Sequence, residues 1–500
     1  MKILSAAQIR EWDQYTMQHE PISPIDLMER AAEACTHWIL EHISQDIFYI
    51  FCTTGNNGGD GLVIARLLKS HNKQVKVFVL SLSAGTDCFN INLERLKQIS
   101  TVEIITLKST SDFPSIPNDA VIIDALFGTG LNRKPEGLAA ELIHFINHTA
   151  KHVIAIDIPS GLLCDRSSKD FPVIKAAHTL SFQCYKPALL LPENAVYFGN
   201  VHILDIKLHT DFLHTVDTNY ELVDFNFIKQ LYKPRNAFSH KGSFGHALII
   251  AGSYGKMGAA VLSTRACLRS GVGLVSAHVP SCGVTILQTA APEAMCRVDR
   301  NEKVITKLDY DVTSYSAVGV GPGIGTDSAT TAFLHHLLVA YPKPLVLDAD
   351  ALNILSEHSE WWPLLPPHSI LTPHPKEFAR LFEENKDDFA RIETALQQAR
   401  TKNLVIVLKG HRTFIATPSG KGYFNTSGNA GMATGGSGDV LTGIITGLLA
   451  QGYSSSEAAI LGVYIHGMAG DQAALHYGMG PMIAGDIIDN LSVIKQLETV

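Results

Sequence analysis

The sequence predicts an α/β protein of two domains, each a doubly wound sheet with helices on both faces. Short apolar runs alternate with longer amphipathic stretches along most of the chain, which is the rhythm of βα units around a parallel sheet. A length of 500 residues is enough for two or three hydrophobic cores of usual size. The rhythm loosens between His209 and Phe238, where we place the boundary between domains 1–220 and 221–500.

The composition favours a protein that acts on small molecules. The formal net charge is -8, and nucleic acids and anionic membranes attract surfaces rich in Lys and Arg, so neither is expected as a partner. The eight cysteines are scattered without a CxxC pair, as in reduced, cytoplasmic proteins. The first residues are charged too early for a signal peptide, and no run of about 18 apolar residues predicts a membrane span.

Apolar runs that end in Gly-rich or Pro-rich loops define the predicted strands. The first forty residues have helical apolar spacing and are expected to cover one face of the first sheet. Strands of the first domain are predicted at 48–52, 75–80, 102–107, 120–128 and 152–161. Strand-containing stretches of the second domain are predicted at 246–253, 273–279, 316–325, 343–352, 368–375, 404–410 and 413–428, followed by helices at 439–450 and 455–477.

Polar side chains follow several strands of the first domain. The stretch NNGGDG at 56–61 joins a strand to a helix, but it lacks the G-x-G-x-x-G spacing of a dinucleotide loop. Asp124 and Asp157 come at the ends of two further strands. Since the carboxyl ends of parallel strands face one crevice, Asn57, Asp124 and Ser160 are placed to converge on a cation or a ribose. The alternative is that the two acids only cap turns or helices.

The second domain carries glycine clusters just past predicted strands. The stretch NAGMATGGSGDV brings bare backbone to the start of a helix at Asp439, where free N–H groups and the positive helix end favour a phosphate. Lys409 and Gly410 follow a strong strand, and VGVGPGIG follows another. GSYGKMG has neither the spacing nor the Ser or Thr of a Walker A loop, so a P-loop NTPase is disfavoured. Any one cluster alone is equally compatible with a tight turn that binds nothing.

Taken together, these motifs resemble known families. GGSGD resembles the anion hole and base of the ribokinase-like superfamily, and the ordered set GPGIG, DADALNIL, LTPHPKEFARL, LKGHRT and NAGMATGGSGDVLTG resembles its ADP/ATP-dependent NAD(P)H-hydrate dehydratases. The set NNGGDG, DALFGTG and IDIPSG resembles the Rossmann-like NAD(P)H-hydrate epimerases. The tandem resembles the bifunctional family that repairs hydrated NADH and NADPH (NADHX and NADPHX), in which the R and S hydrates are interconverted and the S form is dehydrated.

In the first domain, the resemblance implies a substrate site and a potassium site. Asp157 is expected to act as the proton shuttle, and K⁺ is expected at Asn57, Asp124 and Ser160. The implied substrate-binding residues are Asn56, Asn57, Gly58, Gly59, Asp60, Gly128, Thr129, Gly130, Leu131, Asn132, Arg133, Lys134 and Asp157.

In the second domain, the resemblance implies that ADP or ATP, with Mg²⁺, phosphorylates the ring hydroxyl and that phosphate is then eliminated. Asp439 is the expected base. Substrate contacts are implied at Ala259, Gly323, Gly325, His374 and Asp439, although a His in a Pro-rich turn is as often structural. Nucleotide contacts are implied at Lys409, Gly410, His411, Arg412, Thr413, Asn429, Ala430, Gly431, Met432, Ala433, Thr434, Gly435, Gly436, Ser437 and Gly438.

Two other interpretations stay open on the sequence alone. The chain could be a ribokinase-like small-molecule or vitamin kinase with an N-terminal nucleotide-binding domain, which would release a stable phosphorylated product. The N-terminal half could instead be a non-catalytic protein- or RNA-interaction module, although acids that converge in a crevice argue against a scaffold. We also expect a homo-oligomer.

Overall fold

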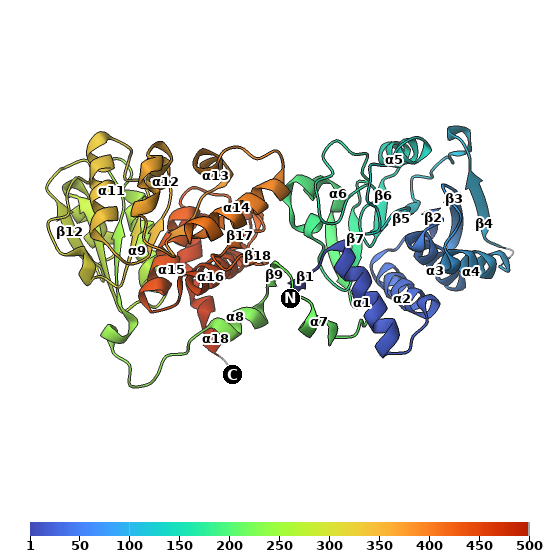
Figure 1. Cartoon of the computed structure of the whole chain (residues 1–500), viewed down its shortest axis with the longest axis horizontal. Coiled ribbons are helices and arrows are strands. Elements are labelled where there is room, and N and C mark those ends of the chain that lie inside the picture. The colour runs from blue at the N-terminus through green and yellow to red at the C-terminus, as the bar shows by residue number, and fades with distance from the viewer. Residues whose placement is uncertain (100, 499–500) are drawn as a thin grey trace. The chain divides into compact units, whose positions relative to one another are not determined.

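The computed structural model describes residues 1–99 and 101–498, which form two compact units. One unit comprises Lys2–Thr218 with the short segment 387–389, and the other comprises Met1, Asn219–Lys386 and residues 390–498. The chain can be followed through both units by colour in Figure 1. Within the described ranges, no helix combines the length and the apolar character that crossing a membrane requires.

The N-terminal unit is built on a parallel sheet with the strand order β4-β3-β2-β5-β6-β7-β8. The strands are β2 (Ile47–Thr53), β3 (Gln74–Leu80), β4 (Glu103–Leu107), β5 (Val121–Ala125), β6 (His152–Ile156), β7 (His178–Phe182) and β8 (Asn200–Leu204), and a short β1 (Lys2–Ile3) precedes them. The predicted strands correspond to β2 through β6, whereas β7 and β8 were not predicted. The order of the strands reverses between β2 and β5, which opens a crevice at their carboxyl ends.

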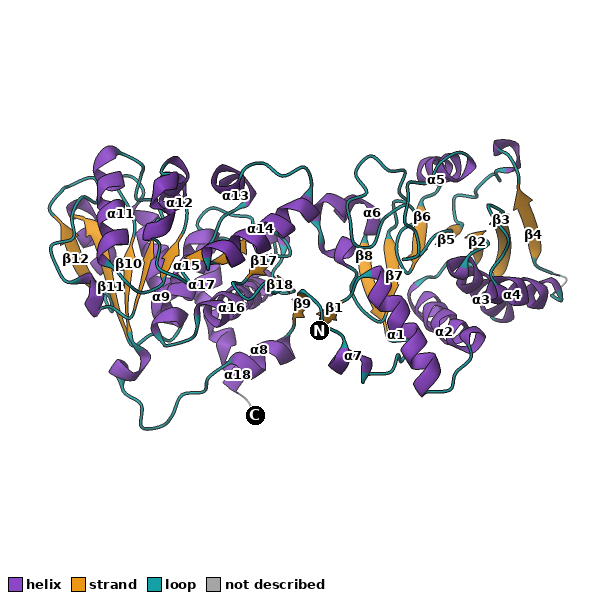
Figure 2. Ribbon diagram, viewed as in Figure 1, coloured by secondary structure: helices purple, strands orange, loops and turns teal. Residues whose placement is uncertain are grey.

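Helices cover both faces of this sheet (Figure 2). They are α1 (Ala6–His19), α2 (Pro24–His42), α3 (Asn56–Ser70), α4 (Asp87–Lys97), α5 (Leu138–Thr149), α6 (Ala195–Phe198) and α7 (Phe212–Thr215). Side chains alternate between the faces of a strand, so Ile50 packs under α2, α3 and α4 while Phe51 packs against α5. The helical start expected from the sequence is confirmed as α1 and α2.

The C-terminal unit contains a larger mixed sheet, in which the order runs β9-β18-β17-β16-β15-β14-β13-β10-β11-β12. The strands are β9 (Tyr220–Val223), β10 (His246–Ile250), β11 (Leu274–Pro280), β12 (Met295–Asp299), β13 (Ala317–Val320), β14 (Leu345–Leu347), β15 (Ile370–Leu371), β16 (Val405–Leu408), β17 (Phe414–Ala416) and β18 (Gly422–Asn425). The stretch 413–428 forms the antiparallel hairpin β17–β18, and β17 also pairs antiparallel with β16. The other pairs from β9 to β12 are parallel.

Helices again lie on both faces of this sheet. They are α8 (Phe225–Leu231), α9 (Met257–Arg269), α10 (Val284–Ala290), α11 (Ser328–Ala340), α12 (Asp350–Glu357), α13 (Pro375–Phe382), α14 (Asp388–Lys402), α15 (Ser437–Ala450), α16 (Ser455–Tyr477), α17 (Ala484–Asp489) and α18 (Lys495–Glu498). Helices α15 and α16 share a core with one face, and α11 and α12 cover the other. Helices α15 and α9 approach each other closely at Gly443. A Cβ on this residue would lie only 2.1 Å from the Ser263 carbonyl oxygen.

Candidate active sites

The glycines of the NNGGDG motif let α3 start close to the sheet. A Cβ on Gly58 would lie 1.8 Å from the carbonyl oxygen of Thr53 at the end of β2, and one on Gly61 would lie 2.6 Å from the Ala125 Cβ in β5. Gly55 precedes the helix and supplies no side-chain cap. The first amides of α3 therefore meet the crevice between β2 and β5 without a capping side chain.

A cavity of 640 Å³ lies at this end of the sheet, and most of the sequence-predicted substrate residues line it. Those residues are Asn56, Asn57, Asp60, Gly128, Thr129, Gly130, Leu131, Asn132, Arg133 and Asp157. Gly58 and Gly59 are instead buried in the helix packing. Lys134 is directed elsewhere, with its Nζ 5.8 Å from the centre of the Phe171 ring.

Asp157 is held by a buried lysine that the sequence analysis did not identify. Lys186, whose side chain is fully buried, places its Nζ 2.7 Å from Asp157 Oδ1. The same ammonium donates hydrogen bonds to Ser181 Oγ and to the Phe182 carbonyl, each at 2.8 Å. Burial by itself lowers the pKa of Lys186, but the Asp157 carboxylate outweighs it, so the pKa is raised. The buried ammonium thus fixes the Asp157 carboxyl group at the cavity wall.

Two more carboxyl groups line the cavity, from α1 and α3. Burial, followed by the nearby Asp157 carboxylate, raises the pKa of Asp13 to about 7. Burial also raises the pKa of Asp60 well above its ordinary value. Asp13 was not predicted, although the sequence holds a signal for it. The residue lies four positions after Ile9 and four before Met17, so it is an acid on an otherwise apolar helix face, where a residue that only packs would be apolar.

The residues predicted to bind potassium are only partly brought into contact. Asp124 is fully buried and accepts hydrogen bonds from Ser160 N at 2.8 Å and Ser160 Oγ at 2.6 Å. Burial raises the pKa of Asp124 to about 6. Asn57 is next to Gly128 and Asp157, since a Cβ on Gly128 would lie 3.3 Å from Asn57 Oδ1 and 3.2 Å from Asp157 Oδ2. Among the described atoms, Asn57 Nδ2 is buried without a hydrogen-bond partner.

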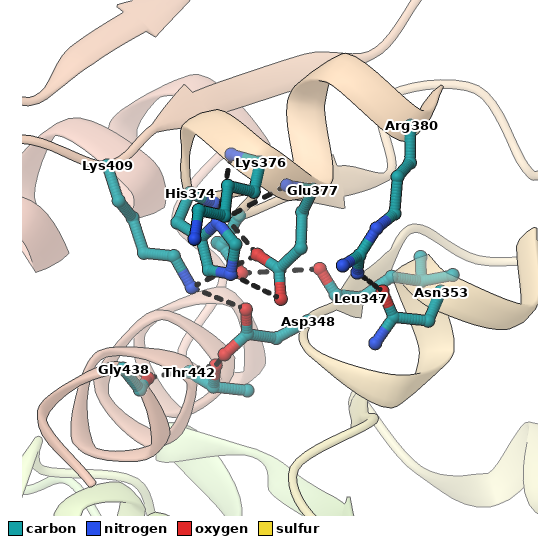
Figure 3. A network of polar contacts seen from close by, with 11 residues as sticks. Leu347, Asp348, Asn353, His374, Lys376, Glu377, Arg380, Lys409, Gly438 and Thr442 are labelled. Carbon is teal, nitrogen blue, oxygen red and sulfur yellow. Dashed lines mark hydrogen bonds and ion pairs between the residues drawn. The ribbon is translucent and has the colours of Figure 1, made fainter. Parts of the chain in front are cut away.

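In the C-terminal unit, Lys409 is the centre of a polar network (Figure 3). Its Nζ lies 2.8 Å from Asp348 Oδ1 and 3.9 Å from Glu377 Oε2. The other carboxylate oxygen of Asp348 accepts a hydrogen bond of 2.7 Å from Thr442 Oγ1 on α15. Burial lowers the pKa of Lys409, but the neighbouring carboxylates, Asp348 first, raise it overall. The strand end at β16 and the start of α15 are thereby joined through Asp348, which begins the DADALNIL motif but was not predicted as a site residue.

The start of α15 has the features of an anion site. Gly436 precedes the helix with a left-handed φ of 90° and gives no side-chain cap. The amides of Gly438 and Asp439 have no hydrogen-bond acceptor among the residues that the structure describes. A Cβ on Gly438 would lie 3.4 Å from Lys409 Nζ, so two of the predicted nucleotide segments meet here. Burial, followed by the Asp348 carboxylate, raises the pKa of Asp439 to about 6.

The rest of the predicted nucleotide segment 429–438 is held by hydrogen bonds of its polar side chains. Asn429 Nδ2 donates to Asp471 Oδ1 at 2.9 Å, and Asn429 Oδ1 accepts from Gly431 N at 3.0 Å. Ser437 Oγ lies 3.3 Å from Nε2 of His466, whose pKa burial lowers to about 4. The segment is therefore shaped before any ligand binds.

His374 has a structural role in this fold. Its Nδ1 accepts hydrogen bonds from Lys376 N at 3.1 Å and Glu377 N at 3.2 Å, which caps α13. Its Nε2 lies 3.5 Å from Glu377 Oε1, so the ring also orients the carboxylate that faces Lys409 (Figure 3). The predicted substrate contact of His374 stays a prediction.

The loop after β13 is held against the start of α9. Gly323 has a φ of 65°, and a Cβ on it would lie 3.1 Å from the Ala259 Cβ. Gly325 N donates to Asp350 Oδ2 at 2.9 Å, and Lys256 Nζ is 3.6 Å from the same oxygen. The structure thus brings the predicted substrate residues Ala259 and Gly323 together.

Fold and sites define a two-domain α/β enzyme with an acid-lined cavity in one domain and a lysine–carboxylate cluster at a glycine-rich helix start in the other. Residues 247–492 match the NAD(P)H-hydrate dehydratase family, and residues 24–188 match the YjeF-related protein N-terminus. The chain belongs to the family of bifunctional NAD(P)H-hydrate repair enzymes, with an epimerase and a dehydratase domain.

Relatives of full length support this membership. The bifunctional NAD(P)H-hydrate repair enzyme of Moorella thermoacetica is 36% identical over 100% of this chain and 97% of its own length. That of Coxiella burnetii is 34% identical over 97% and 98%. A ribokinase-like superfamily protein of Enterococcus faecalis, 28% identical, covers 56% of this chain and 98% of its own with a TM-score of 0.50. The predictions of fold class, family and two activities are confirmed, and the repair function is favoured over the kinase alternative.

Proposed function

We propose that Asp157 and Asp439 are the proton-transfer groups of the two activities. Epimerisation interconverts the R and S hydrates of NADH and NADPH in the N-terminal cavity. Dehydration returns the S hydrate to the reduced nicotinamide at the start of α15. The observation that carries the proposal is the position of Asp439, in the first turn of α15 beside amides without acceptors and beside Lys409.

Dehydration needs a better leaving group than hydroxide. Transfer of a phosphoryl group from ADP or ATP to the ring hydroxyl supplies one, because phosphate leaves readily at neutral pH. Asp439 accepts the hydroxyl proton during this transfer, while the Gly438 and Asp439 amides and Lys409 stabilise charge on the phosphoryl oxygens. Elimination of phosphate then restores the ring double bond, so a kinase-like site yields a dehydrated product.

A magnesium ion that accompanies the nucleotide fits the carboxylates near Lys409. Mg²⁺ in phosphoryl-transfer sites is held by one or two carboxylates, several waters and the substrate phosphates. Asp348 and Glu377 would supply those carboxylates. Across the described ranges, no group of three or more His, Cys, Asp and Glu side chains is arranged to hold a metal ion by itself. The ion, when bound, neutralises charge on the phosphates, and the chain's own residues orient the substrate and take its proton.

A potassium ion fits Asn57, Asp124 and Ser160 chemically. All three offer oxygen atoms, which hard cations prefer. Asp124 supports the assignment because its carboxylate is fully buried and, within the described part of the chain, pairs with no cationic side chain. A cation there would supply the missing counter-charge and hold together the strand ends that shape the cavity.

Crossed single variants test the two assignments. Asp157→Asn should lose interconversion of R and S hydrates and keep dehydration, whereas Asp439→Asn should do the reverse. The full-length chain is assayed on each hydrate with ADP or ATP supplied separately, following the absorbance of reduced nicotinamide and the release of orthophosphate. Loss of both activities in either variant contradicts independent sites. Accumulation of a stable phosphorylated compound in the unmodified chain would revive the kinase alternative.

We also propose that the protein works in the cytoplasm and as a homo-oligomer. All eight cysteines are free thiols, as in a reducing compartment. Large apolar side chains at Leu475, Tyr477, Met479 and Ile483 are exposed near the end of α16, which suits a contact between copies. Sedimentation of the purified chain tests the oligomer: a monomer at micromolar concentration contradicts it.

A further inference from the structure

The N-terminal cavity holds more charged groups than one proton shuttle requires. Carboxyl groups reach it from three separate elements: Asp13 on α1, Asp60 on α3 and Asp157 after β6. Arg10 and Arg133 also line it, as do the thiols of Cys88 and Cys184, and Lys186 stands against Asp157. These acids line a cavity of 640 Å³, which is large enough for a ring, so their different surroundings decide which of them can exchange protons with a ligand.

Asp157 and Asp13 are placed in opposite electrostatic settings. Asp157 has the Lys186 ammonium 2.7 Å from its Oδ1. Asp13 forms no ion pair with a cationic side chain in the described ranges, and burial together with the Asp157 charge raises its pKa to about 7. The cavity therefore presents one carboxyl group that is paired with a buried ammonium and one that is not, and the pKa of the unpaired Asp13, about 7, lets it both hold and release a proton at neutral pH. Two carboxyl groups in different surroundings within one site are typical of acid–base catalysis.

Asp13 is fixed in position by its helix. Trp12 Nε1, one residue away, donates a hydrogen bond of 2.8 Å to the His209 carbonyl, and Thr16 Oγ1 accepts from His209 N at 2.9 Å. Ser5 and Gln8 close a capping box at the start of α1. These contacts anchor α1 on both sides of Asp13, so its carboxyl group is presented to the cavity by a rigid element.

We propose that Asp13 is a second catalytic residue of epimerisation, acting as the proton donor that works with Asp157 as the base. This inference rests on the proposed role of Asp157. The Asp157 carboxylate takes the proton of the ring hydroxyl, the bond between that carbon and the ring nitrogen breaks with its electron pair going to nitrogen, and Asp13 protonates the nitrogen. The carbon becomes an aldehyde, which can rotate.

Closure reverses the same transfers on the other face of the aldehyde. Asp13 takes back the proton from nitrogen as the carbon–nitrogen bond re-forms, and Asp157 returns its proton to the hydroxyl oxygen. No atom is gained or lost, and both carboxyl groups end in their starting states. Loss of hydroxide would need an acid alone, so the presence of a lysine-held base beside an acid favours ring opening.

Asp60 is less suited to this role. The residue is only 8% exposed, whereas Asp13 is half-buried, so a ligand in the cavity reaches Asp13 more readily. Burial also raises the pKa of Asp60 well above its ordinary value.

The experiment compares Asp13→Asn with Glu11→Gln, a matched carboxyl-to-amide change at an exposed position of the same helix. Both are made in the full chain, together with Asp157→Asn, and R-to-S conversion of hydrated NADPH is followed by chromatography between pH 5.5 and 9. We expect Asp13→Asn to lower kcat about 100-fold or more and Glu11→Gln to leave it unchanged. In the unmodified chain, kcat should fall as pH rises above about 7, and the residual activity of Asp13→Asn should lack this fall. Dehydration of the S hydrate reports on the integrity of each preparation.

The outcomes separate this inference from the proposed function. If Asp157→Asn epimerises at the full rate, the proposed function fails. If Asp157→Asn is impaired while Asp13→Asn matches Glu11→Gln, or changes KM alone, Asp13 is not the proton donor. A second readout uses H₂¹⁸O, in which ring opening retains the hydroxyl oxygen; incorporation of ¹⁸O at each turnover overturns the ring-opening step. Because Asn removes a buried like charge, Asp13→Asn should fold, and Asp13→Glu should recover part of the activity.

Discussion

The Asp439→Asn variant tests two consequences of burying an acid at the start of α15. One is its effect on the rate of dehydration, and the other is its effect on the free energy of unfolding. The variant keeps the shape of the side chain but cannot accept a proton, so dehydration should fall about 100-fold or more while epimerisation is unchanged. Burial and the Asp348 carboxylate raise the pKa of Asp439 to about 6, so dehydration by the unmodified chain should rise with pH through about 6 as the base ionises.

The same raised pKa predicts that the inactive variant is more stable. The folded form binds the proton of Asp439 more tightly than the unfolded chain, so this stabilisation is complete below pH 3.8 and is lost as pH rises through about 6. At 1.36 kcal/mol for each pKa unit, the ionised carboxylate costs the fold about 3 kcal/mol above that pH.

Asn carries no such cost. The free energy of unfolding of Asp439→Asn, from urea titrations, should therefore exceed that of the unmodified chain by up to about 3 kcal/mol at pH 8, and the gain should shrink toward pH 4. A variant that is less stable at pH 8, or a gain that does not depend on pH, would refute the assignment of Asp439 as a buried base held at a cost. Retention of nucleotide-dependent dehydration would refute its catalytic role.

Two further substitutions probe packing around the sites. Gly58→Ala puts a Cβ 1.8 Å from the Thr53 carbonyl oxygen, so α3 must shift and epimerisation should fall more than dehydration. Gly480→Ala, which adds a Cβ in open space, serves as the neutral control. Equal effects of the two substitutions on epimerisation would contradict the close approach of α3 to Thr53. Lys409→Met leaves the buried Asp348 carboxylate without its cation and should lower the free energy of unfolding by about 3–5 kcal/mol, with most of the loss recovered in Lys409→Met/Asp348→Asn. An unchanged urea midpoint for the single variant would show that the ion pair does not support the fold.

The sequence predicted most central strands of both units correctly. A strand that is buried on both faces of a sheet is a run of apolar residues with clear ends, which can be recognised in the sequence. Strands β2 through β6 lie where such runs were found, and α16 has the predicted bounds Ser455–Tyr477. Strand β12 was missed because its sequence, MCRVD, is mostly exposed and reads as a loop. Strands β7 and β8 lie among turns and carry His and polar residues, so their apolar signal is weak.

The motif residues were predictable from the sequence, whereas their partners were not. Asn57, Asp157 and Lys409 stand beside glycines or at strand ends, where their type and position are informative together. Lys186 and Asp348 act through contacts with residues distant along the chain, and only the fold brings them within 2.8 Å of Asp157 and Lys409. No local spacing encodes such a contact.

The close approach of α15 to α9 limits how the dehydratase site can open. Gly443 lies against the Ser263 carbonyl, and a Cβ on Gly447 would lie 1.9 Å from Ser270 Oγ, so α15 is locked in place at two successive turns. The helix that carries the Gly438 and Asp439 amides then cannot slide along its axis without a clash with α9. We therefore expect exchange of nucleotide at the proposed site to depend on movement of the segment before Gly436, and the rate of product release to be set by residues that need not touch the phosphate at all.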